Sequence, residues 1–289
     1  MSRLQTFAPA KVNLTLCVLA RRPDGYHELS SLVAFTDIGD ELALVPGAGL
    51  DLSLAGALAA AAGPRNGNLV LKAARALQER IEGLQFGRFE LTKHLPAGAG
   101  LGGGSADAAA ALRLIAQANG LELQDARILE AARSVGADVP VCLESNARLM
   151  HGIGEILSAP LTLPRLDAVI VFPGVPLATR DVFGNFTLVA GPRRKTRYAD
   201  SEIPSERSGL LEFLAREAND LELAARLVEP AISEAKAMLE QGEARLVRMS
   251  GSGSALFALY DNASHAKRAA AKVAKRKPDW WVKATTLNA

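Results

Sequence analysis

A glycine-rich segment directly before an alanine-rich helix, residues 96–107, constrains this chain most strongly. It reads Pro-Ala-Gly-Ala-Gly-Leu-Gly-Gly-Gly-Ser-Ala-Asp, with five glycines between Gly98 and Gly104. Glycine leaves the backbone free and has no side chain, so successive N–H groups can surround an anion. The helix expected over 105–119 adds unpaired N–H groups and the positive end of its dipole. The segment therefore predicts a phosphate-binding loop, and a mere tight connection between two elements is the alternative.

Two well-known phosphate motifs do not fit this segment. No Gly-Lys-Ser/Thr follows it, so the lysine of a Walker A loop is missing. A dinucleotide-binding fingerprint has an acidic residue about 20 residues further on, at the end of a strand. Glu122 lies at that distance, but its surroundings indicate the start of another helix. A nucleotide-dependent dehydrogenase is therefore a remote alternative.

Composition narrows the class of protein and its partners. The chain has 289 residues, 49% of them hydrophobic, and a net charge of +2, which is ordinary for a globular protein of one large or two medium domains. We expect no nucleic-acid or membrane partner, and a monomer or weak homodimer. Residues 1–10 lack the apolar core of a signal peptide, and 54–62 is too short to span a bilayer. Cys17 and Cys142 lie in apolar runs without metal-ligand spacing, so buried thiols and a cytoplasmic location are expected.

Strand and helix patterns alternate along the chain and predict an α+β fold in two layers. The expected strands and helices have clear periodicities, and two prolines near 159–164 indicate a domain boundary. Strands are expected over 11–18, 28–45, 51–54, 86–93, 168–172, 255–260 and 280–284, and helices over 68–82, 105–119, 124–135, 210–217, 221–241 and 263–276. The basic residues of 193–197 predict a solvated loop.

Four further patterns carry polar residues suited to chemistry. Lys11 shares one face of a strand with Asn13 and suits a phosphoryl group, although a lone lysine is usually solvated. Asp24-Gly25-Tyr26-His27 suits a base-reading hairpin, or is only a turn. Asp138, between Gly136 and Pro140, suits a general base, or is only a capping or turn residue. Residues 250–254, Ser-Gly-Ser-Gly-Ser, form a second glycine loop that is either ordered or flexible.

Three of these motifs together resemble the GHMP kinases, the superfamily of galactokinase, homoserine, mevalonate and phosphomevalonate kinases. Residues 96–105 are similar to their central ATP-binding motif, 8–14 to their N-terminal motif and 250–254 to their C-terminal glycine motif. The resemblance implies a two-domain α+β fold. It places a ribosomal S5 domain 2-like ATP-binding domain over 1–160. A second domain over 161–289, with a ferredoxin-like α/β layer, completes the substrate site.

Residues 22–29, 136–140 and 152–155 resemble the branch of this superfamily that acts on a cytidine-diphosphate-linked methylerythritol. The implied reaction is ATP-dependent phosphorylation of one hydroxyl, giving the 2-phosphate, in the non-mevalonate isoprenoid pathway. ATP is the implied co-substrate and Mg²⁺ the implied metal, whose ligands the sequence does not identify. Another GHMP kinase, for mevalonate or homoserine, and an inactive GHMP-fold binding protein are the alternatives.

The resemblance also assigns residues by position. Asp138 would take the proton of the substrate hydroxyl, while Lys11 would hold Asp138 ionised and stabilise phosphate charge. Tyr26 and His27 would hold the cytosine, and Asn13 and Thr179 would contact the substrate. The ATP phosphates would be surrounded by Pro96, Ala97, Gly98, Ala99, Gly100, Leu101, Gly102, Gly103, Gly104, Ser105 and Ala106.

Two residues of the loop depart from the family pattern. Ala99 stands where a glycine is frequent, and its methyl group requires a negative φ. Ala106 stands where a second serine is frequent, so Ser105 carries the one hydroxyl of residues 96–106. Neither change removes the backbone N–H groups on which the predicted phosphate site depends.

Overall fold

The computed structural model describes residues 2–47, 49–186 and 197–288. Its strands are β1 (Leu4–Asn13), β2 (Cys17–Arg21), β3 (His27–Pro46), β4 (Asp51–Ala55), β5 (Gly87–Thr92), β6 (Arg148–Gly152), β7 (Ile156–Leu157), β8 (Leu166–Phe172), β9 (Leu246–Met249), β10 (Leu256–Tyr260) and β11 (Trp281–Leu287). Its helices are α1 (Leu69–Gln78), α2 (Gly103–Asn119), α3 (Ala126–Val135), α4 (Val139–Cys142), α5 (Thr179–Asn185), α6 (Arg207–Arg216), α7 (Glu222–Val228), α8 (Ala231–Glu240) and α9 (Ala263–Arg276). Short 3₁₀ turns are η1 (Ala59–Ala62), η2 (Arg65–Gly67) and η3 (Asp200–Glu202).

The chain divides into two compact units that interleave along the sequence. Unit 1 comprises Met1–Lys11, Ile38–Ala97 and Gly102–Ser145, and unit 2 comprises Val12–Asp37, Gly98–Leu101 and Asn146–Ala289. Strands β1 and β3 and the glycine loop each contribute residues to both units. The division into 1–160 and 161–289 expected from the sequence stays a prediction.

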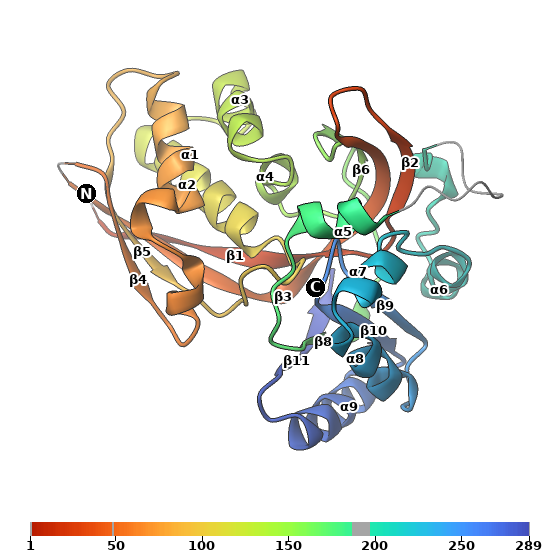
Figure 1. Ribbon diagram of the computed structural model, residues 1–289. Coiled ribbons are helices and arrows are strands. Elements are labelled where there is room, and N and C mark those ends of the chain that lie inside the picture. The colour runs from red at the N-terminus through yellow and green to blue at the C-terminus, as the bar shows by residue number, and fades with distance from the viewer. Residues whose placement is uncertain (1, 48, 187–196, 289) are drawn as a thin grey trace. The chain divides into compact units, whose positions relative to one another are not determined.

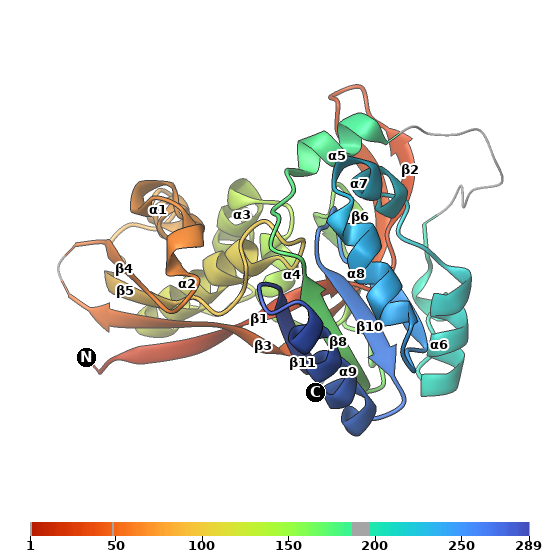
Figure 2. The ribbon, with the colours of Figure 1, turned by 60° about the horizontal axis from the view of Figure 1, so that its bottom comes forward.

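Unit 1 is a sheet covered by helices on one face. The second half of β3 pairs antiparallel with β5, from Glu41 opposite Thr92 to Pro46 opposite Gly87, and β4 pairs parallel with β5. Figures 1 and 2 both show α1, α2 and α3 on the same side of these strands. Helix α1 turns its apolar stripe inward because its leucines and alanines recur at helical spacing.

The helix that follows the glycine loop is buried over most of its length. Helix α2 begins at Gly103, two residues before the predicted start, and its N-cap Gly102 has φ 66°. The alanines from Ala108 to Ala111 are fully buried. Their small side chains let neighbouring backbones approach the helix closely. Gly120, with φ 63°, ends the helix in the left-handed conformation expected for a C-terminal glycine.

Unit 2 contains the ferredoxin-like layer that the resemblance implies. Its four strands lie in the order β11-β8-β10-β9, and each neighbouring pair is antiparallel. With helices between β8 and β9 and helix α9 between β10 and β11, this is the β-α-β-β-α-β arrangement. Figure 2 shows α8 and α9 against this sheet, and their apolar residues share a core with Val169, Leu256 and Ala258. The predicted α+β class is therefore confirmed.

Local differences from the predicted elements have local causes. The strand expected over 11–18 is interrupted between Asn13 and Cys17, where the backbone N–H of Leu14 donates to Leu32 instead. The helix expected over 221–241 is two helices, because Pro230 lacks the N–H that would continue α7. Arg193, Arg194 and Lys195 of the basic segment lie outside the described residues.

The state of the two cysteines and the absence of a membrane-spanning helix were both expected from the sequence, and both can be examined in the described residues. Cys17 and Cys142 are free and buried, as the sequence predicts, and burial raises the pKa of Cys142 to about 12. Within residues 2–47, 49–186 and 197–288, no helix combines the length and apolar character that crossing a membrane requires.

Candidate active site

Lys11 and Asp138, both in unit 1, form an ion pair. The Lys11 Nζ lies 3.1 Å from the Asp138 Oδ2, and the two side chains are 4% and 39% exposed. The alternative of a solvated lysine is therefore wrong, since the ammonium is buried. Asp138 lies in the turn before α4, at its N-cap position, but its side chain makes no capping hydrogen bond, so the capping alternative is wrong and the turn position is present. The pair leaves a carboxylate that is partly open to solvent, backed by a buried positive charge.

The start of α2 lies against Lys11. A Cβ atom on Gly102 would stand 3.2 Å from both the Cβ and the Cε of Lys11. The backbone N–H groups at the start of an α-helix have no intrahelical partner. The helix end that attracts anions and the Lys11–Asp138 pair are therefore neighbours within unit 1.

Behind the start of α2, unit 1 contains three buried charged residues that the sequence analysis did not single out. Lys93 lies between Asp40 and Asp107, and its ammonium donates to both carboxylates. Burial raises the pKa of Asp107 to about 7, although Lys93 acts in the opposite direction. The only sequence signal was a Lys-His-Leu-Pro segment in front of the glycines, which periodicity alone does not distinguish from a strand end.

In unit 2, the second glycine loop holds residues 98–101 of the first. The Ser250 hydroxyl donates to the Gly100 carbonyl at 3.0 Å, and the Ala255 N–H donates to the Ala99 carbonyl at 2.9 Å. A Cβ on Gly100 would stand 2.4 Å from the Ser250 carbonyl oxygen, so only glycine fits there. Ala99 is not among the residues with positive φ, as its methyl group requires. Of the two interpretations of residues 250–254, an ordered or a flexible loop, these contacts favour the ordered loop.

Asn219 fixes this second loop from a distance of 30 residues along the chain. Its Nδ2 donates to the carbonyls of Met249, at 2.9 Å, and Gly251, at 2.7 Å, and its Oδ1 accepts from the Leu221 N–H at 3.0 Å. The sequence offers no motif around this asparagine that would have revealed its role.

We expect Asn219→Asp to weaken ATP binding by about tenfold. The aspartate has the same shape as the asparagine and can still accept from the Leu221 N–H. It has no N–H to donate, so the Met249 and Gly251 carbonyls lose their hydrogen bonds and face a negative carboxylate instead. Isothermal titration with ATP measures the effect. Asn185→Asp, at the end of α5, is the matched control, and equal affinities of the wild type and Asn219→Asp contradict this role.

Asn13 is buried beside the same loop. Its backbone N–H donates to the Ser250 Oγ at 3.1 Å, and its Nδ2 donates to the Ser31 Oγ at 2.8 Å. The side chain is thus held by protein partners within unit 2. A direct contact between Asn13 and the substrate stays a prediction.

Tyr26 and His27 lie at the hairpin between β2 and β3, and their surroundings differ. Tyr26 is 59% exposed. His27, in contrast, stacks on Phe183, with ring centroids 4.4 Å apart and an interplanar angle of 22°. Phe186 meets the same imidazole edge-on at 6.4 Å. Burial, with Arg21 nearby, lowers the pKa of His27. Neither Phe183 nor Phe186 was expected at this site from the sequence, where their spacing of three residues was the available signal.

Thr179 begins α5 and contacts the second glycine loop. Its Oγ1 and the Ser252 Oγ are 2.9 Å apart, and either can donate. The structure thus joins Thr179, Asn13 and Gly100 to the loop of 250–254 within unit 2. In unit 1 it joins Lys11, Asp138 and Gly102. Pro96, Ala97, Gly103, Gly104, Ser105 and Ala106 also belong to unit 1, and Gly98, Ala99 and Leu101 to unit 2.

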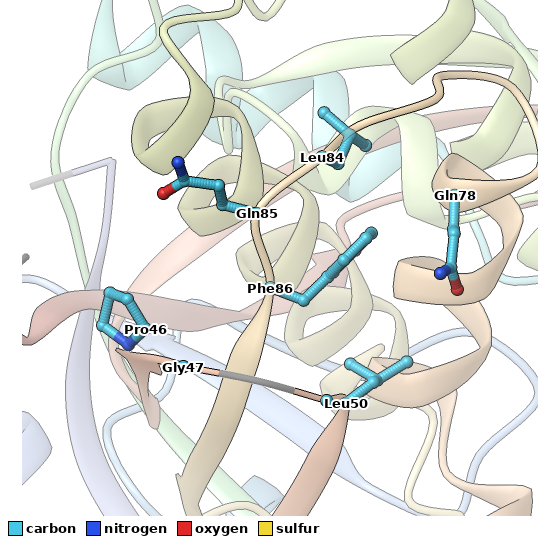
Figure 3. A pocket seen from close by; sticks show the side chains of 8 residues that line it. Pro46, Gly47, Leu50, Gln78, Leu84, Gln85 and Phe86 are labelled. Atoms are coloured by element: carbon cyan, nitrogen blue, oxygen red, sulfur yellow. The ribbon is translucent and has the colours of Figure 1, made fainter.

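A pocket of about 450 Å³ opens at the other end of the unit 1 strands. Figure 3 shows Leu50, Leu84 and Phe86 around it, with Gln78 of α1. It lies where β5 begins, whereas the glycine loop follows the end of β5. Its described lining carries no charged side chain, so it offers nothing to balance a triphosphate.

Comparisons with known proteins agree with the motifs. Residues 68–146 match the family description "GHMP kinases N terminal domain" and residues 204–279 match "GHMP kinases C terminal". A 4-diphosphocytidyl-2-C-methyl-D-erythritol kinase of Azorhizobium caulinodans is 51% identical over 289 residues, all of both chains. A crystal structure of 4-(cytidine 5'-diphospho)-2C-methyl-D-erythritol kinase, 34% identical, superposes with a TM-score of 0.79 over 99% of this chain and 100% of that one.

A more distant structure shares the fold alone. The homoserine kinase of Cytophaga hutchinsonii is 22% identical and superposes with a TM-score of 0.74, covering 99% of this chain and 94% of that chain. The expected two-domain α+β fold is thus confirmed.

Proposed function

The chain belongs to the GHMP kinase family of ATP-dependent kinases, and from this premise we propose that it phosphorylates 4-diphosphocytidyl-2-C-methyl-D-erythritol. The product is the 2-phosphate, an intermediate of the non-mevalonate route to isoprenoid precursors. The choice of substrate is supported by two 4-diphosphocytidyl-2-C-methyl-D-erythritol kinases that are 51% and 50% identical to this chain over its full length.

The observation that carries the proposal is the ion pair of Lys11 and Asp138. Phosphoryl transfer to an alcohol needs a group that accepts the hydroxyl proton and a positive charge near the transferring oxygens. Asp138 offers a carboxylate that is 39% exposed, while Lys11 is buried behind it at 3.1 Å. We assign proton acceptance to Asp138 and charge stabilisation to Lys11.

The ATP phosphates are assigned to residues 96–106. The N–H groups at the start of α2 favour anions, and Gly102 places this helix end against Lys11. Mg²⁺, which we also propose, neutralises phosphate oxygens in such reactions. It would keep several waters and be bound mainly through the ATP phosphates. We propose that Ser105, which has the one hydroxyl of residues 96–106, would contribute a protein oxygen.

The cytosine is assigned to the hairpin of Tyr26 and His27. Phe183 covers one face of the His27 ring, and we propose that the imidazole meets the base with its edge. Tyr26, exposed and aromatic, is left to stack on it. Asn13 and Thr179 complete the proposed substrate contacts. We also propose a cytoplasmic enzyme that is a monomer or weak homodimer.

Tyr26→Ala is expected to raise the KM for the cytidine substrate by about 5- to 150-fold, since base–aromatic stacking contributes about 1–3 kcal/mol. The KM for ATP is expected to stay unchanged. Steady-state kinetics with each substrate varied in turn gives both values. Tyr26→Phe keeps the ring and serves as the control, and an unchanged KM in Tyr26→Ala sinks the stacking role.

An ATP-consumption assay tests the proposed function directly. The purified protein is given 4-diphosphocytidyl-2-C-methyl-D-erythritol, mevalonate or homoserine in parallel, with ATP and Mg²⁺. We expect turnover with the cytidine compound alone. Turnover with mevalonate or homoserine instead indicates another kinase of this family, and ATP binding without any turnover indicates a binding protein.

A further inference from the structure

Three charged side chains are buried together in unit 1 and take no part in the reaction proposed above. Lys93 follows β5, Asp40 lies on β3 and Asp107 lies in α2, and the three residues are at most 4% exposed. The Lys93 Nζ donates to the Asp40 Oδ2, and it donates to the Asp107 Oδ2 at 2.7 Å. We call these residues the Lys93 cluster.

The Lys93 cluster holds the backbone that leads into the glycine loop. The second carboxylate oxygen of Asp40 accepts the N–H groups of His94, at 2.6 Å, and Leu95, at 2.9 Å. These residues come directly before Pro96, where the proposed phosphate-binding segment begins. One carboxylate thus fixes the direction in which the chain leaves β5.

The same cluster holds the helix on the far side of the loop. A Cβ on Gly103, the first residue of α2, would stand 3.6 Å from the Asp40 Oδ2 and 3.4 Å from the Leu95 Cβ. Asp107, four residues further along α2, is tied to Lys93. Through Asp40 and Asp107, Lys93 therefore links the backbone of residues 94–95, directly before the segment, to α2, which follows the loop.

Stability alone does not account for this arrangement. Two carboxylates share one ammonium, and the Asp107 Oδ1 is buried without a hydrogen-bond partner. Burial disfavours the charge on Lys93, but Asp107 and Asp40 outweigh it and raise its pKa. Buried ion clusters are often replaceable by apolar side chains without loss of stability, while they can fix one geometry. A buried carboxylate oxygen without a hydrogen-bond partner has a cost in stability, which a geometric role of the cluster offsets.

We propose that Lys93, Asp40 and Asp107 are positioning residues for ATP, which set the start of α2 and residues 94–97 in the geometry that receives its phosphates. The proposal rests on the proposed function, since it takes residues 96–106 as the phosphate site. It assigns no contact between the cluster and ATP itself.

Lys93→Met is the first test, because methionine keeps the length of the side chain and removes the bridge. We expect ATP to bind at least about tenfold more weakly by calorimetry, since displacements of about 1 Å in such sites have effects of this size or larger. Affinity for 4-diphosphocytidyl-2-C-methyl-D-erythritol, measured alone, is expected to stay within about twofold. Lys72→Met, the same change at an exposed position of α1, is the control. ATP affinity equal to that of the wild type in folded Lys93→Met overturns the proposal.

Asp107→Asn and Asp107→Ala separate geometry from charge and serve also if Lys93→Met does not fold. Both remove the same negative charge, but only Asn keeps an oxygen for the Lys93 ammonium. We expect Asn to leave ATP affinity within about threefold and Ala to lower it by at least about tenfold. Equal effects, or tighter ATP binding in both, overturn the proposal. A wild type that does not bind ATP refutes the proposed function instead, which keeps the two failures distinct.

Discussion

Asp138→Asn is expected to lower kcat by about 10²- to 10⁴-fold, the usual contribution of a positioned general base. The amide has nearly the same shape but cannot accept the proton that leaves the substrate hydroxyl. Because its oxygen still lies toward the buried Lys11 ammonium, we expect the variant to fold and to bind ATP with nearly unchanged affinity. Single-turnover kinetics at saturating ATP and substrate measures the chemical step.

Asp51→Asn is the matched control for this variant. Asp51 begins β4, is exposed, and lies in the same unit as Asp138. It is expected to turn over like the wild type. If Asp138→Asn does so as well, another group accepts the proton and the assignment of Asp138 is lost.

Gly102→Val is expected to abolish both ATP binding and turnover. Gly102 has φ 66°, a conformation in which a β-branched residue is strained. The added Cβ would also press on the Lys11 side chain at 3.2 Å, so the ammonium to which we assign charge stabilisation is expected to shift together with the start of α2. Equilibrium titration with ATP and the ATP-consumption assay are the two measurements.

Gly47→Val is the matched control, with the same change at a glycine outside residues 96–106. Gly47 belongs to unit 1, and an added Cβ there would meet nothing within 4 Å. We expect this variant to keep the ATP affinity of the wild type. Wild-type ATP affinity in Gly102→Val means that the segment is not the phosphate site.

Several elements were predictable because short-range physics decides them. The repeat of apolar residues at helical spacing predicted α1, and the bounds of α9 agree with those expected, residues 263–276. The turn at Arg22–Gly25 follows from proline and glycine, and Gly25 has φ 88°. The division of residues 221–241 into two helices is equally local, because Pro230 has no backbone N–H to continue α7.

The site was predictable as far as its motifs reach along the chain. The glycine loop, Lys11 and Asp138 were recognisable because each stands in a pattern of its own, and the Lys11–Asp138 pair is present in the structure. Phe183 and Lys93 carry only a weak signal in their local sequence, and Asn219 carries none. Their partners His27, Met249 and Asp40 come from other strands or loops, and the topology of the sheets decides which of them meet.

The sequence by itself thus determined that a glycine-rich loop precedes a small-residue helix, and that the motifs of an ATP-dependent kinase family surround it. Backbone conformation and periodicity are properties of neighbouring residues, so they are legible in one dimension. Only the tertiary structure decided that Lys11 is buried against Asp138, and that Lys93 bridges Asp40 and Asp107 behind the loop. Charged residues that are far apart along the chain form pairs only when folding buries them together, because a charge removed from water needs an opposite charge as its partner.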